Sequence, residues 1–217
     1  MQITSPAFKR NASGALGDAQ LQKALGNVRA GFIDKRRKAM DALPEFDRLR
    51  DNARDIKNHV LAHLDLYLTA YEEKVTASGG HVHWAETAAD ARGIILDICR
   101  KHNARTVAKG KSMITEEIAL NDFLEASGIT PVETDLGEYI IQLRGEHPSH
   151  IIAPAVHLNK EQVEEDFRRV HIDLPPGRDL SDPASLLGEA RRVLRRKYFE
   201  ADVGITGANF LVAETGS

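Results

Sequence analysis

The sequence predicts an α/β protein whose mostly parallel sheet is flanked by helices and preceded by a helical N-terminal appendage. Before Gly79, apolar residues recur at spacings of three and four, the period of an amphipathic helix. After Gly80, short strand-like runs alternate with helical segments, which is typical of a parallel sheet. The glycine pair divides the two patterns. We therefore expect a helical appendage over residues 1–78 and an α/β domain over residues 79–217.

The appendage is expected to hold two or three helices between residues 18 and 78. Leu61, Leu64 and Leu68 lie on one helical face and give the strongest of these signals. Asp18 is a suitable N-cap for the first helix. Pro44 lacks the amide donor that a helix interior needs, so a helix is expected to end or restart there.

The α/β domain is expected to alternate strands and helices along its length. The patterns predict strands at 81–85, 105–109, 130–134, 149–153, 203–206 and 210–213, and helices at 88–102, 115–127, 160–170 and 185–198. The last of these strands runs into a tight turn where a return strand would be expected. The domain is therefore expected to be incomplete at its C-terminus.

Composition excludes several classes of protein. The net charge of -3 gives no general attraction to nucleic acid, and the basic runs at 34–38 and 191–197 lack interleaved aromatic residues. A single cysteine, Cys99, excludes a disulfide scaffold and fits a reducing cytoplasm. We expect no signal peptide and no membrane span. The predicted location is cytoplasmic, with peripheral docking at the inner face of the membrane left open.

The segment 109–117 is the first candidate site, because it joins a predicted strand to a predicted helix. Two lysines and the free amides of a helix start could hold an anion there. It is not a P-loop, since Arg105 stands where that motif needs glycine. The alternative is a well-capped helix with solvated lysines. The candidate ligand-binding residues are Lys109, Lys111, Ser112 and Thr115.

A second candidate site is acidic. Glu133, Asp135 and Glu138 leave the end of a strand and could perform acid–base chemistry or hold a cation. The alternative is a polar loop whose acids cap the following helix. If the strands 105–109 and 130–134 are neighbours, these acids are expected to face Lys109 and Lys111.

Further candidates flank later strands. His150 and His157 border the run that ends at Ala155, and the turns near the C-terminus offer Asn209, Glu214 and Thr215. Ordinary turn chemistry is the alternative for the latter group. Cys99 lies among apolar residues on a predicted helix, so we expect a buried, inert thiol.

Histidine pairs raise the question of a metal site. His59 and His63 share a predicted helix face, and His81 and His83 share a predicted strand face. Zinc can use such spacings. No HExxH glutamate and no convergent cysteine accompany them, so no metal site is predicted.

Four ordered stretches together resemble the lactate utilization protein B family. They cover most of residues 81–217, and the helical front end fits as well. The matching stretches are Lys111-Ser112-Met113 with Thr115-Glu116-Glu117, residues 133–143, residues 148–155 with His157, and residues 204–210 with 213–217.

The resemblance implies a lactate-utilization domain related to the ribose-5-phosphate isomerase and CoA-transferase-like folds. Family members continue into a ferredoxin-like domain that holds two [4Fe–4S] clusters, and they act with partner subunits that oxidise L-lactate to pyruvate. Such clusters need several thiolates, so Cys99 alone binds none and no cofactor is expected in this chain.

The resulting prediction is a non-cluster domain that binds a small carboxylate, other lactate-utilization subunits, or both. The resemblance assigns no catalytic residues to this domain. Two alternatives stay open. One is a stand-alone enzyme of the isomerase or cyclo-ligase type. The other is a structural scaffold whose basic helix faces dock a partner subunit.

Overall fold

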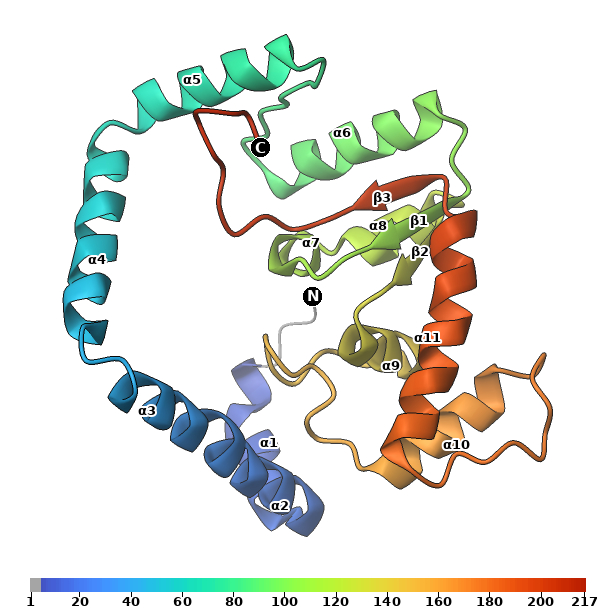
Figure 1. Cartoon of the computed structure of the whole chain (residues 1–217). Coiled ribbons are helices and arrows are strands. Elements are labelled where there is room, and N and C mark those ends of the chain that lie inside the picture. The colour runs from blue at the N-terminus through green and yellow to red at the C-terminus, as the bar shows by residue number, and fades with distance from the viewer. Residues whose placement is uncertain (1–4) are drawn as a thin grey trace. The chain divides into compact units, whose positions relative to one another are not determined.

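The computed structural model describes residues 5–217, apart from the side chain of Ala30. The chain forms two compact units. The first contains the residues up to Leu25 together with Ala85–Gly207, and the second contains Gly26–Trp84 together with Ala208–Ser217. Figure 1 shows the order of the elements within each unit.

The first unit is built on a parallel sheet of three strands in the order β2-β1-β3. These are β1 (Thr106–Lys109), β2 (Thr130–Glu133) and β3 (Val203–Ile205). Both pairings are parallel, and Lys109 aligns with Glu133 on one side and Ile205 on the other. The predicted α/β class and the neighbouring strands at 105–109 and 130–134 are confirmed.

Helices cover both faces of this sheet (Figure 1). One core cluster joins Leu96 and Cys99 to Val107 of β1 and to Leu120. A second cluster gathers Tyr139, Phe167, Leu186 and other side chains. The helices that belong wholly or partly to this unit are α1 (Phe8–Gly17), α2 (Ala19–Val28), α6 (Ala88–Lys101), α7 (Met113–Glu117), α8 (Leu120–Ala126), α9 (Leu136–Arg144), α10 (Lys160–Val170) and α11 (Pro183–Glu200), with a 3-10 turn at Ser5–Ala7.

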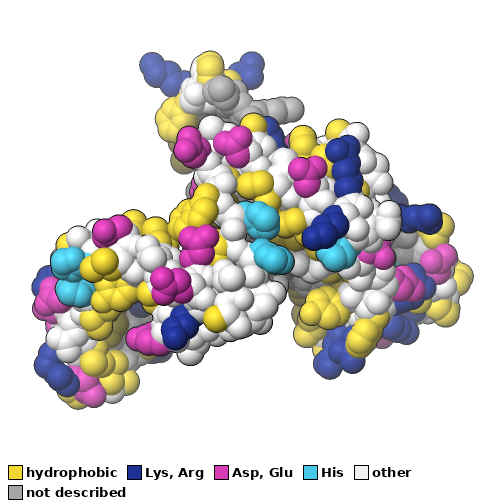
Figure 2. All heavy atoms as spheres, turned by 90° about the horizontal axis from the view of Figure 1, so that it is seen from above, with side chains coloured by type: hydrophobic (Ala, Val, Ile, Leu, Met, Phe, Trp, Pro, Cys, Tyr) yellow, Lys and Arg dark blue, Asp and Glu magenta, His cyan; other side chains and the backbone are white. Residues whose placement is uncertain are grey.

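The second unit is helical. It contains a π-helical turn (Arg29–Ile33), α3 (Asp34–Asp41), α4 (Phe46–Ala62) and α5 (Leu64–Ala77). Among the described residues, α3, α4 and α5 hold no buried side chain. Figure 2 shows apolar side chains interspersed with charged and histidine side chains on one face of the molecule.

Two local predictions for the N-terminal helices are confirmed. The Asp18 carboxylate accepts a hydrogen bond from the Leu21 amide at 2.9 Å, as an N-cap does. Pro44 lies between the end of α3 and the start of α4. None of the helices in the described part of the chain is long and apolar enough to cross a membrane.

Three predicted strands are wrong. Residues 81–85 have no ladder partner. Residues 149–153 form a turn, in which the amides of Ile152 and Ala153 donate to the His150 ring and the Ser149 amide donates to Pro154. Residues 210–213 also have no ladder partner, and the Val212 amide donates to the Ser217 carbonyl across the turn at 213–216. Local acceptors take the amides that a sheet would use in both turns.

Two helix predictions also need correction. The single helix expected at 115–127 is broken into α7 and α8 at Ala119, whose φ of 50° is left-handed. No helix was predicted for residues 136–144, where α9 follows β2. Asp135 caps its start and Gly145, with a φ of 65°, ends it. This helix positions two of the acidic candidates, Asp135 at its N-cap and Glu138 in its first turn.

Candidate functional site

The centre of the site is a buried ion pair at the C-terminal ends of β1 and β2. Lys109 Nζ donates to Glu133 Oε1 at 2.6 Å and to Asn121 Oδ1 at 2.7 Å. Lys109 is 1% exposed and Glu133 is 2% exposed. Glu116 lies 3.7 Å from the same ammonium. Lys109 is therefore neutralised inside the protein and does not face an external anion.

Glu133 is only partly satisfied. Its Oε1 also accepts from Asn121 Nδ2 at 2.7 Å. Its other oxygen, Oε2, is buried and has no hydrogen-bond partner. A buried acceptor left without a donor is costly, by roughly 1–3 kcal/mol. Glu133 Oε2 is thus a buried acceptor with capacity for a further hydrogen bond.

Lys111 forms the outer part of the site. Its Nζ lies 3.7 Å from Asp135 Oδ1 and 3.7 Å from Glu138 Oε1. The Lys111 side chain is 35% exposed, whereas the Glu138 side chain is 7% exposed. The structure therefore brings both predicted lysines against the predicted acids, at one edge of the sheet.

The charges of this cluster do not balance. Lys109 and Lys111 stand against four carboxylates, those of Glu116, Glu133, Asp135 and Glu138. With every group ionised, two positive charges and four negative charges leave the cluster at -2. An additional anion is unfavourable in this cluster unless a cation or a proton binds with it.

Within this cluster, Glu138 has a strongly shifted pKa. Burial raises the pKa of Glu138 from 4.5 to about 7, and the negative charge of Glu133 adds to the effect. Lys111 lowers this pKa, while Asp135 and Glu116 raise it further. A carboxyl that titrates near neutral pH suits acid–base work.

The helix-start amides in this region are already used. The Ser112 hydroxyl accepts from the Thr115 amide at 3.4 Å, and the Thr115 hydroxyl donates to the Ser112 carbonyl at 2.8 Å. Asp135 Oδ1 accepts from the amides of Gly137 and Glu138. Ser112 and Asp135 therefore cap α7 and α9, as the sequence left open for both segments, and Thr115 bonds back to the Ser112 cap.

The loops at this edge approach one another closely. A Cβ placed on Gly207 would lie 2.7 Å from the Lys111 carbonyl oxygen. A Cβ on Gly137 would lie 3.0 Å from Pro154. The segments after β1, β2 and β3 and the turn at 149–154 thus border the same edge of the sheet.

His157 links a hydroxyl to a carboxylate in the neighbouring turn. Ser149 Oγ lies 2.6 Å from His157 Nδ1, and His157 Nε2 lies 3.0 Å from Glu146 Oε2. Hydrogen bonds from His157 and Arg144 outweigh burial and lower the pKa of Glu146. His150 instead accepts local amides through Nδ1. The two predicted histidines therefore stabilise the turn beside the lysine–carboxylate cluster.

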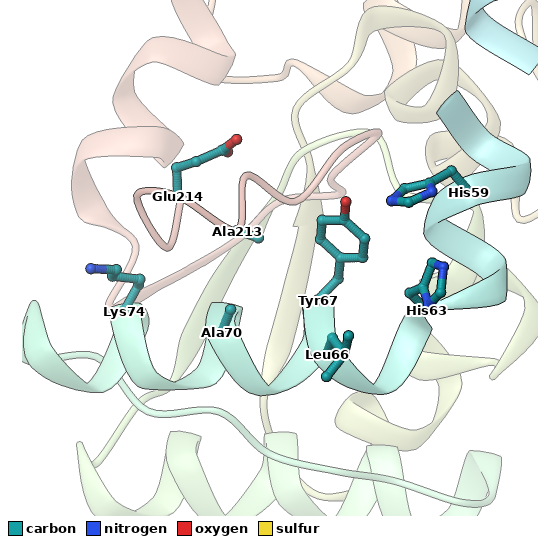
Figure 3. Close-up of a pocket in the computed structure, with 8 residues that line it drawn as sticks. All are labelled: His59, His63, Leu66, Tyr67, Ala70, Lys74, Ala213 and Glu214. Atoms are coloured by element: carbon teal, nitrogen blue, oxygen red, sulfur yellow. The ribbon is translucent and has the colours of Figure 1, made fainter. Parts of the chain in front are cut away.

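The remaining candidates fall in the second unit. Asn209 and Thr215 are exposed, and Thr215 Oγ1 donates to Ser217 at 2.9 Å. Glu214 lines an open pocket of about 570 Å³ together with His59, His63, Tyr67 and Lys74 (Figure 3). The sequence does not indicate this pocket, because it depends on the C-terminal tail folding back beside α5.

Among the described residues, no group of three or more His, Cys, Asp or Glu side chains is placed to hold a metal ion. Cys99 is 0% exposed, and burial raises the pKa of its thiol. The buried thiol expected from the sequence is confirmed.

Several further residues contribute to the site but were not predicted from the sequence. Asn121 and Glu116 contact Lys109, and Gln142 donates to the Pro131 carbonyl while it accepts from the Glu133 amide. Thr134 Oγ1 donates to the Lys109 carbonyl at 2.6 Å. Polar residues on helices α7, α8 and α9 give no spacing signal toward a strand end, so only the fold identifies them.

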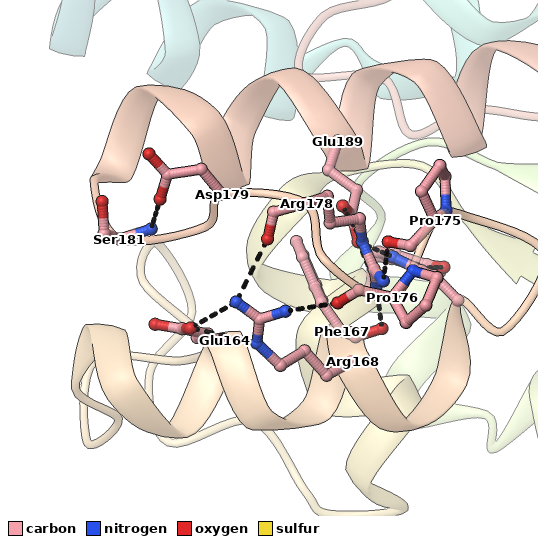
Figure 4. Close-up of polar contacts among 11 residues, drawn as sticks. Glu164, Phe167, Arg168, Pro175, Pro176, Arg178, Asp179, Ser181 and Glu189 are labelled. Carbon is pink, nitrogen blue, oxygen red and sulfur yellow. Dashed lines mark hydrogen bonds and ion pairs between the residues drawn. The ribbon is translucent and has the colours of Figure 1, made fainter.

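A second buried polar network lies under α11. Glu189 accepts from Arg178 and is paired with His171 Nδ1 at 2.7 Å, while His171 Nε2 lies 2.9 Å from the Tyr139 hydroxyl. Figure 4 shows Arg178 reaching Glu189 and the Phe167 carbonyl, with Arg168 beside it. Its members are paired with one another, which is typical of a structural network.

The chain closely resembles known bacterial proteins over its whole length. It is 42% identical over 219 residues to "Lactate utilization protein B" of Bacillus licheniformis and 41% identical over 218 residues to the protein of that name in Bacillus subtilis. It is 41% identical over 217 residues to "Uncharacterized electron transport protein YkgF" of Escherichia coli. Each alignment covers 100% of this chain and 45% of the relative.

The chain thus spans less than half the length of the curated relatives it matches. No solved structure matches it. The model of the LUD domain matches residues 68–217, which include the sheet and the whole lysine–carboxylate cluster. Since this match extends over more than half of the sequence, the chain belongs to the LUD domain family.

Proposed function

We propose that this chain is the LUD-domain part of a bacterial lactate-utilization protein. The observation that carries the proposal is its identity of 41–43% with proteins named lactate utilization protein B, maintained from end to end of the chain. In this proposal, electron transfer belongs to an iron–sulfur domain outside residues 1–217, because Cys99 alone cannot ligate a cluster. Other lactate-utilization subunits are its proposed partners.

Within that role, the proposed task of the domain is to bind a small monocarboxylate at the sheet edge. Lys111, 35% exposed, is the cation that an entering carboxylate can reach, whereas Lys109 is buried against Glu133. Lys109 then acts as a positioning residue that fixes Glu133. Lactate and pyruvate are the first ligands to test, given the names of the relatives.

A chimera tests the role in lactate utilization. The matching part of the Bacillus subtilis lactate utilization protein B is replaced by this chain, and the chimera is expressed in a strain lacking that protein. We expect growth on L-lactate as sole carbon source, with glucose growth as the control for general fitness. A chimera that is produced at normal levels but gives no growth on lactate contradicts the proposal.

The binding task is tested on the same chimera and on the purified chain. Lys111→Ala is expected to weaken lactate-dependent growth, whereas Lys101→Ala, at the exposed end of α6, is expected to leave it intact. Calorimetric titrations of the folded chain with L-lactate, pyruvate and phosphate give the direct measurement. The absence of heat with all of them contradicts carboxylate binding.

A docking role is the second candidate, and the exposed end of α11 favours it. Tyr198 is 62% exposed and Phe199 is 69% exposed, and the Arg195 guanidinium lies 4.6 Å from the Phe199 ring. Arginine and aromatic residues are enriched at protein interfaces. Under this alternative, Arg195→Ala with Phe199→Ala abolishes lactate-dependent growth while ligand binding by the purified chain persists.

A further inference from the structure

We propose that the lysine–carboxylate cluster at the sheet edge binds a small monocarboxylate together with one proton, and that Glu138 holds this proton. The inference rests on the proposed carboxylate site and specifies how that site works. It follows from the position of one buried carboxyl group between a partly exposed lysine and other acids.

Glu138 is surrounded mainly by other acids. It lies in the first turn of α9, with Lys111 at 3.7 Å from its Oε1. The charged groups that act on it are Glu133 of β2, Asp135 at the α9 N-cap and Glu116 of α7, besides Lys111. Three of these four neighbours are negative. A protonated Glu138 removes one repulsive charge from a crowded cluster.

Glu133 Oε2 is buried without a hydrogen-bond donor. This oxygen keeps its negative potential inside the protein because the donors of Lys109 and Asn121 both go to Oε1. An acceptor-rich site of this kind lacks protons rather than acceptors. It therefore favours a proton on the neighbouring acid over a further bare anion.

An arriving ligand adds a further negative charge beside Lys111. A monocarboxylate that reaches Lys111 competes with Asp135 and Glu138 for the same ammonium, each of which lies 3.7 Å from it. The new negative charge raises the proton affinity of Glu138 further, since like charges disfavour ionisation. By linkage, ligand and proton then bind cooperatively, and either one promotes the uptake of the other.

Titration calorimetry of the full chain tests the proposal with L-lactate and pyruvate as probes. Each titration is performed between pH 5.5 and 8.5 in two buffers of different ionisation enthalpy, so that the buffer-dependent heat counts protons. We expect roughly half a proton to one proton taken up per ligand at pH 8 and almost none at pH 5.5, because Glu138 is already protonated in acid. Affinity should fall up to about tenfold per pH unit above neutrality.

Two variants make the assignment specific. Glu138→Gln imitates the protonated carboxyl, so it should bind the ligand with an affinity that no longer depends on pH and without proton uptake. Glu125→Gln, exposed on α8, should retain the wild-type uptake. A 13C-NMR titration of labelled glutamate carboxyls should show one resonance that titrates near pH 7, moves to higher pH with lactate, and is absent from Glu138→Gln.

Several results would overturn the proposal. One is ligand binding with equal heats in both buffers across the pH range. Another is a Glu138→Gln variant that still takes up a proton. A folded chain that binds neither acid at any pH also overturns it, together with the carboxylate site. The growth of the lactate chimera is a separate result, so the role in lactate utilization can survive each of these failures.

Discussion

Lys109 Nζ lies 2.6 Å from Glu133 Oε1, and this ion pair joins the ends of two adjacent strands with side chains only 1% and 3% exposed. Removing one partner of a buried pair leaves an uncompensated charge, which costs about 3–5 kcal/mol. Lys109→Met is therefore expected to lower the free energy of unfolding by about that amount. Urea unfolding followed by circular dichroism measures it.

The double variant Lys109→Met with Glu133→Leu serves as the matched control for this pair. It leaves no buried charge unpaired, so most of the lost stability should return. Lys101→Met, at an exposed position in the same unit, should change the free energy of unfolding by less than roughly 0.5 kcal/mol. If Lys109→Met behaves like Lys101→Met, the pair is not a stabilising feature of the fold.

Glu138 is expected to make stability depend on pH near neutrality. Burial, followed by the charge of Glu133, raises its pKa from 4.5 to about 7. An acid whose pKa rises on folding stabilises the protein fully below pH 4.5, and this contribution is lost as the pH rises through about 7. Glu138→Gln should therefore exceed the wild type in stability at pH 8, by roughly 3 kcal/mol.

The same denaturant titrations at pH 4.5 and pH 8 check this prediction. At pH 4.5 the two proteins should differ in free energy of unfolding by only a few tenths of a kcal/mol, because Glu138 is protonated in the folded chain and about half protonated in the unfolded chain. A constant difference between the two proteins at both pH values would contradict the raised pKa.

The sequence predicted which charged residues form the site but not how deeply they are buried. The lysines after one strand and the acids after the next were predicted to meet if the strands were neighbours, and the β1–β2 pairing brings them together. Sequence spacing could not show that Lys109 is buried or that Glu138 is screened from water. Burial depends on helices α7, α8 and α9, whose packing is a property of the whole unit.

The errors in the fold also have local causes. The run 149–153 has strand-like residues, but the His150 ring and the Pro154 carbonyl take its amides and hold it as a turn. Ala119 adopts a left-handed conformation, which is not expected for alanine, and it divides one predicted helix into two. The three paired strands and the helices 88–102 and 160–170 were predicted to within a residue, whereas the helix predicted at 185–198 extends over Pro183–Glu200.

The network under α11 is expected to control stability in acid. Burial opposes ionisation of Glu189, but hydrogen bonds from Arg178 and His171 outweigh it and lower its pKa. A lowered pKa gives stability that is present above the unfolded value of 4.5 and is lost as the pH falls through the lower folded value. Glu189→Gln should thus be less stable than the wild type at pH 6, with a smaller difference at pH 3.

Thermal unfolding followed by circular dichroism at pH 3, 4.5 and 6 measures this effect. Glu125→Gln, an exposed acid on α8, is the control and should follow the wild-type profile closely. A Glu189→Gln variant that loses stability equally at all three pH values would show that packing, rather than ionisation, accounts for the effect.

Gly207 should prove intolerant of a side chain because the strand-end loops meet there. A Cβ at this position would lie 2.7 Å from the Lys111 carbonyl oxygen and 3.1 Å from Ser112 Cα, both backbone atoms that cannot rotate aside. Gly207→Ala is therefore expected to lower the melting temperature and to weaken monocarboxylate binding. Gly188→Ala is the control, since nothing lies within 4 Å of its Cβ in α11. It should stabilise the chain by roughly 0.5–1 kcal/mol. Equal melting temperatures for Gly207→Ala and the wild type would mean that these two loops do not pack together in solution.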